Sequence, residues 1–432
     1  MTATASSHPR PRTNLRWWIG LLLGFGILIN YFDRVNLSVA HPDLTHDFGV
    51  NDIQYGYLLS GFAWTYALLQ IPGGMLLDRI GILWIGRLGP LLWSFACFWT
   101  SLASSFTHLF ASRLLLGVAE TPAFPVSSKA TGYWFPLSER GLATSLFDAA
   151  AKFSNVIGVP IVAAIAFYWG WRLMFVVTAC FSLLYFALFT IYYRNPSEDK
   201  RLSPDELRYI PEGGAQPEGA PSAKGASLGY LLSSSKVWGL TIGFAAYGYS
   251  FYLFLTWLPS YLVTSQHWTI LKSGLFTAIP WAVATITDLV VGGWLVDYLI
   301  SRGYEQTKVR KGLIVLGMVL GLAIIGATTT KDPTIAIIYI SIALGGLAFS
   351  APIGWSIPAL IAPKGSVGTV GSIMNFFNNV MGIAAPIVTG YIVGSTQSFT
   401  NAFLTAAAVL VVGILAYVVV LGKIEPIPDP AG

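Results

Sequence analysis

Charged side chains stand inside long apolar stretches of this 432-residue sequence. Asp33 and Arg34 lie within the apolar run 17–40, and Arg113 and Glu120 lie within the run 107–128. An ionisable group at the centre of a membrane helix costs at least ~2.5 to 3.5 kcal/mol on insertion scales and usually faces a bundle interior or a water-filled cavity. These four charges therefore predict a functional site.

Two of the charges suit an anion and two suit a proton. The guanidinium groups of Arg34 and Arg113 stay charged, and each can hold a carboxylate through two parallel hydrogen bonds. Glu120 follows Arg113 by about two helical turns, so both project from one helix face. A carboxylate in an apolar setting is costly to keep charged, which suits Asp33 and Glu120 to proton coupling. When no substrate is bound, we expect Asp33 to reach Arg113. The alternative is that the four charged side chains only hold the helices together as ion pairs.

Other polar residues extend this predicted anion site. Lys152 follows Asp148 at the i, i+4 spacing of a helical ion pair, so it either neutralises Asp148 or adds a second positive contact to the anion. Asn375 and Asn379 lie one turn apart, and Tyr31 lies in the first apolar run. Amides and phenols can bind hydroxyl groups of a substrate, with interhelical hydrogen bonding as the alternative.

The elements that carry these residues are apolar runs. Hydrophobic residues form 54% of the sequence and charged residues 10%, against roughly a quarter charged in an average soluble domain. The runs are long enough to cross a ~30 Å hydrocarbon core as helices and lack the alternation of barrel strands. We expect them at 17–40, 54–77, 84–104, 107–128, 139–165, 171–193, 236–263, 270–299, 311–330, 333–360, 365–393 and 399–422. The sequence thus predicts an all-α polytopic membrane protein with twelve transmembrane helices.

The basic residues between the runs fall mostly on one set of alternate connections, with Arg172, Lys272 and Lys331 on the other. By the positive-inside rule, both termini and the long middle connection are expected in the cytoplasm. The net charge of +5 then faces the lipid surface, and no nucleic acid partner is expected. A cleaved signal peptide at the N-terminus is the alternative, but Asp33 and Arg34 would lie in its apolar region.

Residues 194–235 replace the apolar pattern with Pro, Gly, Ser and charges of both signs, which indicates a linker. Ser203, ahead of Asp205 and Glu206, can cap one short helix there. Six runs precede the linker and six follow it. We therefore expect a cytoplasmic tail 1–16, a six-helix bundle 17–193, the linker 194–235, a second six-helix bundle 236–422 and a tail 423–432.

A short repeat relates the two halves. GGMLLD at 73–78 and GGWLVD at 292–297 each end the second run of their half. Two related six-helix halves are a transporter architecture, with the substrate near the midplane between them. Asp288, just before the second string, is expected to brace the cytoplasmic end of its own helix.

These strings carry a resemblance. GGMLLDRIG resembles the loop signature of the major facilitator superfamily, and YFDRVNLSVA, FLTWLPSYL at 254–262 and the pair Arg113 and Glu120 are similar to its anion:cation symporter family. The resemblance covers essentially the whole chain and implies transport of organic anions such as sugar acids. It places proton and substrate binding at the charges of the first and fourth runs. It also implies gating roles for Asp78, Arg79 and Asp297.

Together these features predict a plasma-membrane symporter that imports a proton with a small organic anion such as an aldonate, aldarate or hexuronate, and that works as a monomer. The histidines fall in termini, loops and run edges, so carboxylates are expected to carry protons. The sequence has no P-loop and no HExxH string, so neither an enzyme nor a cofactor or metal site is expected. An exchanger of organic phosphates or dicarboxylates is the alternative. A multidrug exporter and a transporter-like sensor fit less well.

Overall fold

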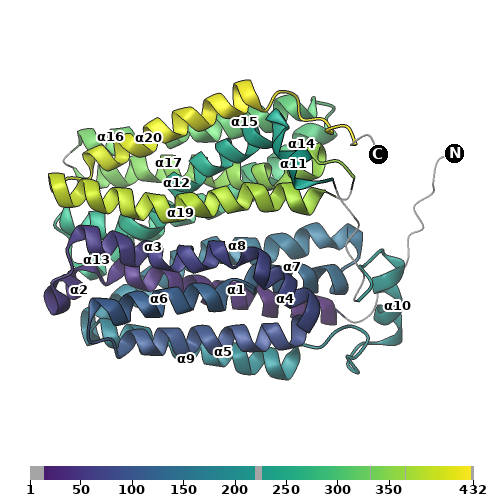
Figure 1. The fold of residues 1–432 in the computed structure, drawn as a ribbon, viewed down its shortest axis with the longest axis horizontal. Coiled ribbons are helices and arrows are strands. Elements are labelled where there is room, and N and C mark those ends of the chain that lie inside the picture. Colours follow the sequence, from purple (N-terminus) through teal and green to yellow (C-terminus); the bar gives the residue numbers. More distant parts are fainter. Residues whose placement is uncertain (1–13, 219–225, 331, 365, 430–432) are drawn as a thin grey trace.

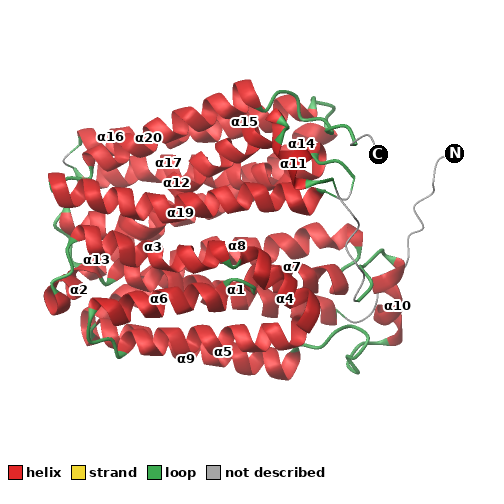
Figure 2. Cartoon of the chain, viewed as in Figure 1, coloured by secondary structure: helices red, strands yellow, loops and turns green. Residues whose placement is uncertain are grey.

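The computed structural model describes residues 14–218, 226–330, 332–364 and 366–429, and its regular elements there are all helices (Figure 1, Figure 2). This confirms the all-α prediction. Most of the expected N-terminal tail, part of the linker, Lys331 and the end of the C-terminal tail lie outside the described residues.

The helices of the first half of the chain lie together, drawn purple to blue in Figure 1. They begin with α1 (Leu15–Val39) and the short α2 (His41–Phe48). The others are α3 (Asp52–Leu68), α4 (Gln70–Ile80), α5 (Ile82–Ser101), α6 (Phe106–Glu120), α7 (Ala123–Trp134), α8 (Leu137–Trp169) and α9 (Trp171–Tyr192).

The second half forms the other layer of helices in Figure 1. Two short helices, α10 (Pro204–Glu212) and α11 (Leu228–Leu232), precede it in the linker. The others are α12 (Ser235–Thr264), α13 (Ile270–Thr287), η1 (Asp288–Leu295), α14 (Val296–Ser301), α15 (Gln306–Gly321), α16 (Ile324–Thr329), α17 (Pro333–Ser356), α18 (Pro358–Ile361), α19 (Val367–Thr396), α20 (Thr400–Leu415) and η2 (Ala416–Val420).

All twelve predicted runs coincide with helices. In the described ranges, nine segments are long and apolar enough, by length and composition, to cross a membrane. The other three runs correspond to α3 with α4, to α6 with α7, and to α12. Leu69 and the Thr121–Pro122 step interrupt the first two, and Gly, Ser, Thr and Tyr dilute the apolar residues of α12.

Local backbone chemistry explains these interruptions. Pro122 has no N–H to donate to the carbonyl of Val118, so α6 ends at Glu120 and α7 begins after the proline. In the second half, the backbone from Asp288 to Leu295 widens into a π-helix that contains the GGWL string. Such π segments often occur at functional sites.

The two halves touch where small residues allow it. Helix α3 packs on α19, and α8 packs on α13. A Cβ added to Gly56 would lie 2.7 Å from the carbonyl oxygen of Pro386, and one added to Gly274 would collide with Ala163. We call the end of the molecule where α1 begins and η2 ends the terminal end, and the opposite end the far end. Both close approaches lie toward the far end.

Polar and aromatic contacts also join the halves at the far end. His41 Nδ1 lies 2.6 Å from Ser260 Oγ, and the hydroxyl groups of Tyr57 and Tyr391 lie 3.2 Å apart. The edge of one ring faces the other where His41 meets Trp257, with centroids 5.8 Å apart. The halves are therefore in direct contact at the far end.

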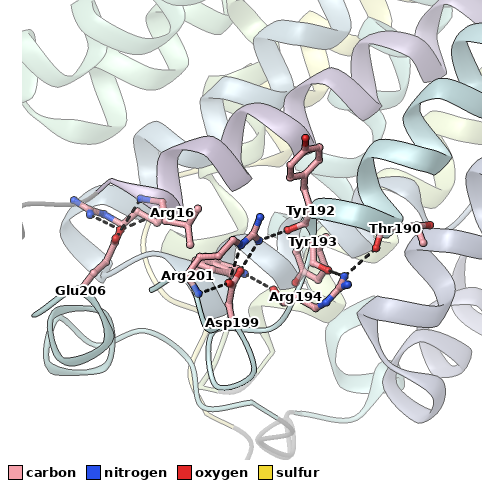
Figure 3. A network of polar contacts seen from close by, with 10 residues as sticks. Arg16, Thr190, Tyr192, Tyr193, Arg194, Asp199, Arg201 and Glu206 are labelled. Atoms are coloured by element: carbon pink, nitrogen blue, oxygen red, sulfur yellow. Dashed lines mark hydrogen bonds and ion pairs between the residues drawn. The ribbon is translucent and has the colours of Figure 1, made fainter. Parts of the chain in front are cut away.

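Part of the linker is folded onto the first half. Ser203 Oγ accepts a hydrogen bond from Glu206 N at 3.2 Å, as predicted for the start of α10. The buried Arg16 binds Glu206 Oε1 at 2.9 Å (Figure 3). It also binds Glu139 Oε2 at 2.6 Å, so α10 is tied to both α1 and α8. These buried ion pairs position the linker helix against the terminal end of the first half.

A second linker contact lies beside the end of α9 (Figure 3). Burial acts to raise the pKa of the Asp199 carboxyl, but hydrogen bonds and charge from Arg201 outweigh it, and the net shift is downward. The guanidinium of Arg201 also donates to the carbonyl of Tyr192. The chain leaving the first half is therefore held close to its last helix.

Candidate functional site

A buried ion pair joins α1 to the end of α6. Arg34 Nε lies 2.8 Å from Glu120 Oε2, and the side chains are 6% and 0% exposed. The guanidinium carbon of Arg34 lies 4.6, 4.5 and 4.9 Å from the ring centroids of Tyr31, Phe62 and Tyr66. Aromatic faces attract a cation, so these rings hold the guanidinium in place.

Asp33 and Arg113 meet differently from the sequence expectation. Arg113 Nη1 donates to the main-chain carbonyl of Asp33 at 3.3 Å. The Asp33 carboxylate instead accepts a hydrogen bond from Ser182 Oγ of α9 at 2.8 Å. Consecutive helical residues point about 100° apart, so Arg34 faces α6 while the Asp33 carboxylate faces α9. The expected carboxylate pairing of Asp33 with Arg113 is therefore wrong for this conformation.

Both arginines keep hydrogen-bond donors that have no acceptor among the described residues. These buried donors are Arg34 Nη2 and Arg113 Nε. A buried donor without a partner costs about 1–3 kcal/mol, and groups of this kind are rare in folded proteins. A carboxylate that accepted from these donors would remove that cost, so the arrangement suits an anion.

Lys152 forms the second charged cluster. Its Nζ lies 2.9 Å from Asp148 Oδ2 and 3.0 Å from Asp288 Oδ2. The i, i+4 contact with Asp148 agrees with its spacing, but Asp288 belongs to η1 in the other half. The expectation that Asp288 braces its own helix end is therefore wrong, because its carboxylate crosses between the halves.

Two tyrosines connect the clusters. Tyr31 lies close enough to both Arg34 and Lys152 for their positive charges to act on its hydroxyl group. Tyr247 of α12 lies within electrostatic range of Lys152, Asp288 and Tyr31. Tyr31 therefore links the arginine cluster to the Lys152 cluster, and Tyr247 lies beside the Lys152 cluster.

The second half adds polar groups to this region. Asn379 Oδ1 of α19 accepts a hydrogen bond from the Tyr252 hydroxyl at 3.1 Å. Tyr252 in turn lies within electrostatic range of Arg34 and Tyr31. Asn375 lies one turn earlier on α19 and is half-buried. The structure thus brings Asn379 toward the arginine cluster through Tyr252.

The residues expected to act in gating lie elsewhere, at the terminal end. Asp78 Oδ1, near the end of α4, binds Lys129 Nζ of α7 at 2.5 Å, and Arg79 is exposed. Asp297 of α14 lies within electrostatic range of Arg310 of α15. Each GG-string aspartate therefore faces a basic residue of a neighbouring helix in its own half.

The sequence did not single out every contact of the site. Phe62, Tyr66 and Ser182 gave no signal, because aromatic residues form 14% of the chain and lone serines are common in helices. Asp288 did stand out as a charge in an apolar run. Its partner could not be found from the sequence, since spacing relates only residues of one helix.

Comparisons with known proteins show the family of the chain. Residues 23–386 match the family model described as Major Facilitator Superfamily. The chain is 45% identical over 414 residues to the uncharacterized transporter YybO of Bacillus subtilis (strain 168), covering 95% of each chain. It is 34% identical over 425 residues to the probable galactarate/D-glucarate transporter GarP of Escherichia coli (strain K12), again covering 95% of each.

A solved structure shows the same fold. It is a bacterial homolog to the human lysosomal transporter Spinster, in an inward-facing and occupied conformation. The TM-score is 0.72 with 18% sequence identity, and the match covers 95% of this chain and 96% of that chain.

Proposed function

The chain belongs to the Major Facilitator Superfamily and is a multi-pass membrane transporter, not an enzyme; we propose that it is a symporter that carries a sugar acid together with protons. The observation that carries this proposal is the buried Arg34–Glu120 pair, 2.8 Å apart, with a guanidinium donor left unpartnered among the described residues. One side chain suits the anion and the other suits the proton. The relative named for galactarate and D-glucarate supports the substrate class.

The cations define how the anion is held. Arg34 and Arg113 present planar guanidinium groups, which bind carboxylates with two hydrogen bonds. Tyr252 and Asn379 supply groups that donate to and accept from hydroxyls. A hydroxylated carboxylate needs both kinds of contact, and Asn375 and Tyr31 extend the polar lining.

Proton coupling follows from competition for Arg34. In the absence of substrate, Glu120 neutralises Arg34. A proton on Glu120 removes that negative charge and leaves the guanidinium to the anion, so proton and anion bind best together. Asp33, fully buried beside Ser182, acts as a second proton site. When the anion leaves, Arg34 is free to pair with Glu120 again, and this pairing favours release of the proton from Glu120.

The orientation of the chain sets the direction of transport. We place both termini in the cytoplasm of a bacterial cell, with the protein in the inner membrane as a monomer, because basic residues concentrate on the loops at the terminal end. The two six-helix bundles 17–193 and 236–422 are the moving units, joined by the linker 194–235. The far end then faces outward, and its contacts make this the conformation that releases substrate to the cytoplasm.

Uptake into proteoliposomes tests the proposal. Radiolabelled galactarate, D-glucarate, an aldonate and a hexuronate are offered with and without an inward proton gradient. We expect at least one to accumulate, and accumulation to disappear when the gradient is dissipated. Uptake that ignores the gradient and needs a preloaded counter-substrate would instead indicate an exchanger of dicarboxylates or organic phosphates.

A further inference from the structure

Lys152 binds two carboxylates, and one of them comes from the other half of the molecule. The Lys152 and Asp288 side chains are 8% and 5% exposed, and their charged atoms lie 3.0 Å apart. Asp148 is more accessible, with a side chain that is 40% exposed. The buried partner of Lys152 is therefore the one on the opposite half.

This cluster is more acidic than a structural ion pair requires. One ammonium balances one carboxylate, and Asp148, on the same helix, already supplies it at 2.9 Å. A buried carboxylate is costly unless it is paired and hydrogen-bonded. Asp288 Oδ1 has no hydrogen-bond partner among the described residues. Asp288 is thus held by a single contact, which another anion can replace.

The cluster also faces the proposed anion site. Tyr31 lies within electrostatic range of Arg34 and Lys152, and Tyr247 lies within range of Lys152, Asp288 and Tyr31. Both cationic groups therefore border the same region between the halves. A dicarboxylate has one carboxylate for each of these two kinds of cation.

We propose that Lys152 is the receptor for the second carboxylate of a dicarboxylate sugar acid, and that Asp288 occupies this receptor when no substrate is bound. This inference rests on the proposed function and narrows its substrate class to dianions. A monocarboxylate engages the arginines but leaves Lys152 with Asp288. A dicarboxylate displaces Asp288 and so breaks an ion pair that joins the two halves.

When the substrate displaces Asp288, the Asp288 carboxylate loses the positive charge that neutralised it. Among the described residues, the titratable groups that lie near Asp288 are Lys152 and Asp148 of α8 and Tyr247 of α12. When Lys152 binds the substrate, a proton can neutralise the Asp288 carboxylate instead. A proton-coupled transport cycle supplies that proton. An asparagine at this position imitates the displaced, protonated acid.

Two variants test the proposal, with uptake of galactarate and of its monocarboxylate counterpart galactonate measured in proteoliposomes. In Lys152→Met, we expect the KM for galactarate to rise about tenfold, the size of one lost charge-assisted hydrogen bond, while the KM for galactonate changes little. Asp288→Asn removes the carboxylate that competes with the substrate for Lys152. The KM for galactarate should therefore fall, while the KM for galactonate should stay at the wild-type value.

Matched controls are Lys272→Met and Asp205→Asn, which remove an exposed lysine and an exposed aspartate outside the site. Both should keep the wild-type KM values. Galactonate uptake in each test variant reports that the protein is folded. If Lys152→Met cannot be purified, two measurements on Asp288→Asn decide the question. They are the KM for galactarate and the rise in melting temperature that galactarate causes in detergent. This rise should exceed the rise seen with the wild type.

The outcomes separate this inference from the proposed function. Equal KM changes for the two acids in Lys152→Met, or a raised galactarate KM in Asp288→Asn, would overturn the role of Lys152 and Asp288 while leaving sugar-acid symport standing. If the wild type moves no sugar acid at all, the proposed function itself fails. If the wild type moves galactonate but not galactarate, the second carboxylate receptor is excluded.

Discussion

At the residue scale, the proposed binding of the anion depends on Arg34. Its guanidinium is held by Glu120 on one side and by three aromatic rings around it. These contacts use the planarity of the group as well as its charge. Arg34 is therefore positioned before any anion arrives, which lowers the entropy cost of binding.

Replacing Arg34 by lysine tests whether planarity matters. Lysine keeps the charge but lacks the planar fork, so we expect the KM of the transported acid to rise by roughly tenfold or more. Kinetics of uptake in proteoliposomes measure this. The control is Arg302→Lys, an exposed arginine that lies over the Tyr298 ring away from the site and should leave the KM unchanged. A wild-type KM in Arg34→Lys would contradict the role of the fork.

Replacing Glu120 by glutamine tests its role in coupling. Glutamine imitates the protonated acid permanently, so the anion should still bind and exchange across the membrane. Accumulation driven by a proton gradient should disappear, because no proton is released from this side chain in the cycle. Counterflow of labelled against unlabelled substrate and gradient-driven uptake measure the two activities separately.

Glu305→Gln, at an exposed position paired with Lys308, serves as the control and should accumulate substrate like the wild type. Gradient-driven accumulation at the wild-type level in Glu120→Gln would rule out Glu120 as a required proton carrier.

At the element scale, the sequence predicts where helices occur better than how they bend. Apolar runs of about 20 residues located the long helices, because hydropathy and length suffice for that. The π-helix from Asp288 to Leu295 has no comparable signal. The breaks at Leu69 and at Pro122 are different, because the missing N–H groups of Pro72 and Pro122 are visible in the sequence. Helix shape depends on neighbours, and the sequence does not name them.

The contact of α8 with α13 gives an element-scale prediction. A side chain at Gly274 would collide with Ala163 in this conformation. We expect Gly274→Leu to prevent closure of the far end, so that transport falls below about one-tenth of wild type while substrate still binds from the far side. Uptake, together with substrate-induced thermal stabilisation in detergent, measures both quantities.

The control for this prediction is Gly368→Leu, since a Cβ at Gly368 meets nothing within 4 Å. It should preserve transport. Normal turnover of Gly274→Leu would show that the contact of α8 and α13 does not close in the cycle.

At the scale of the whole molecule, two halves meet at the far end and share a charged region between them. The repeated GG strings and the central linker predicted the two halves, and family membership agrees with that architecture. The sequence could not predict that Lys152 meets Asp288, because this contact depends on how one half is placed against the other. The sequence also could not predict the partner of the Asp33 carboxylate, because that contact depends on how α1 packs against α9 within the first half.

Proton flux driven by substrate alone shows whether a proton and a sugar acid cross the membrane together. Proteoliposomes with an enclosed pH indicator start with equal pH on both sides, and galactarate or galactonate is then added outside. We expect the lumen to acidify as substrate enters, and we expect Glu120→Gln to abolish the signal. Entry of labelled substrate with no change in luminal pH would contradict proton symport.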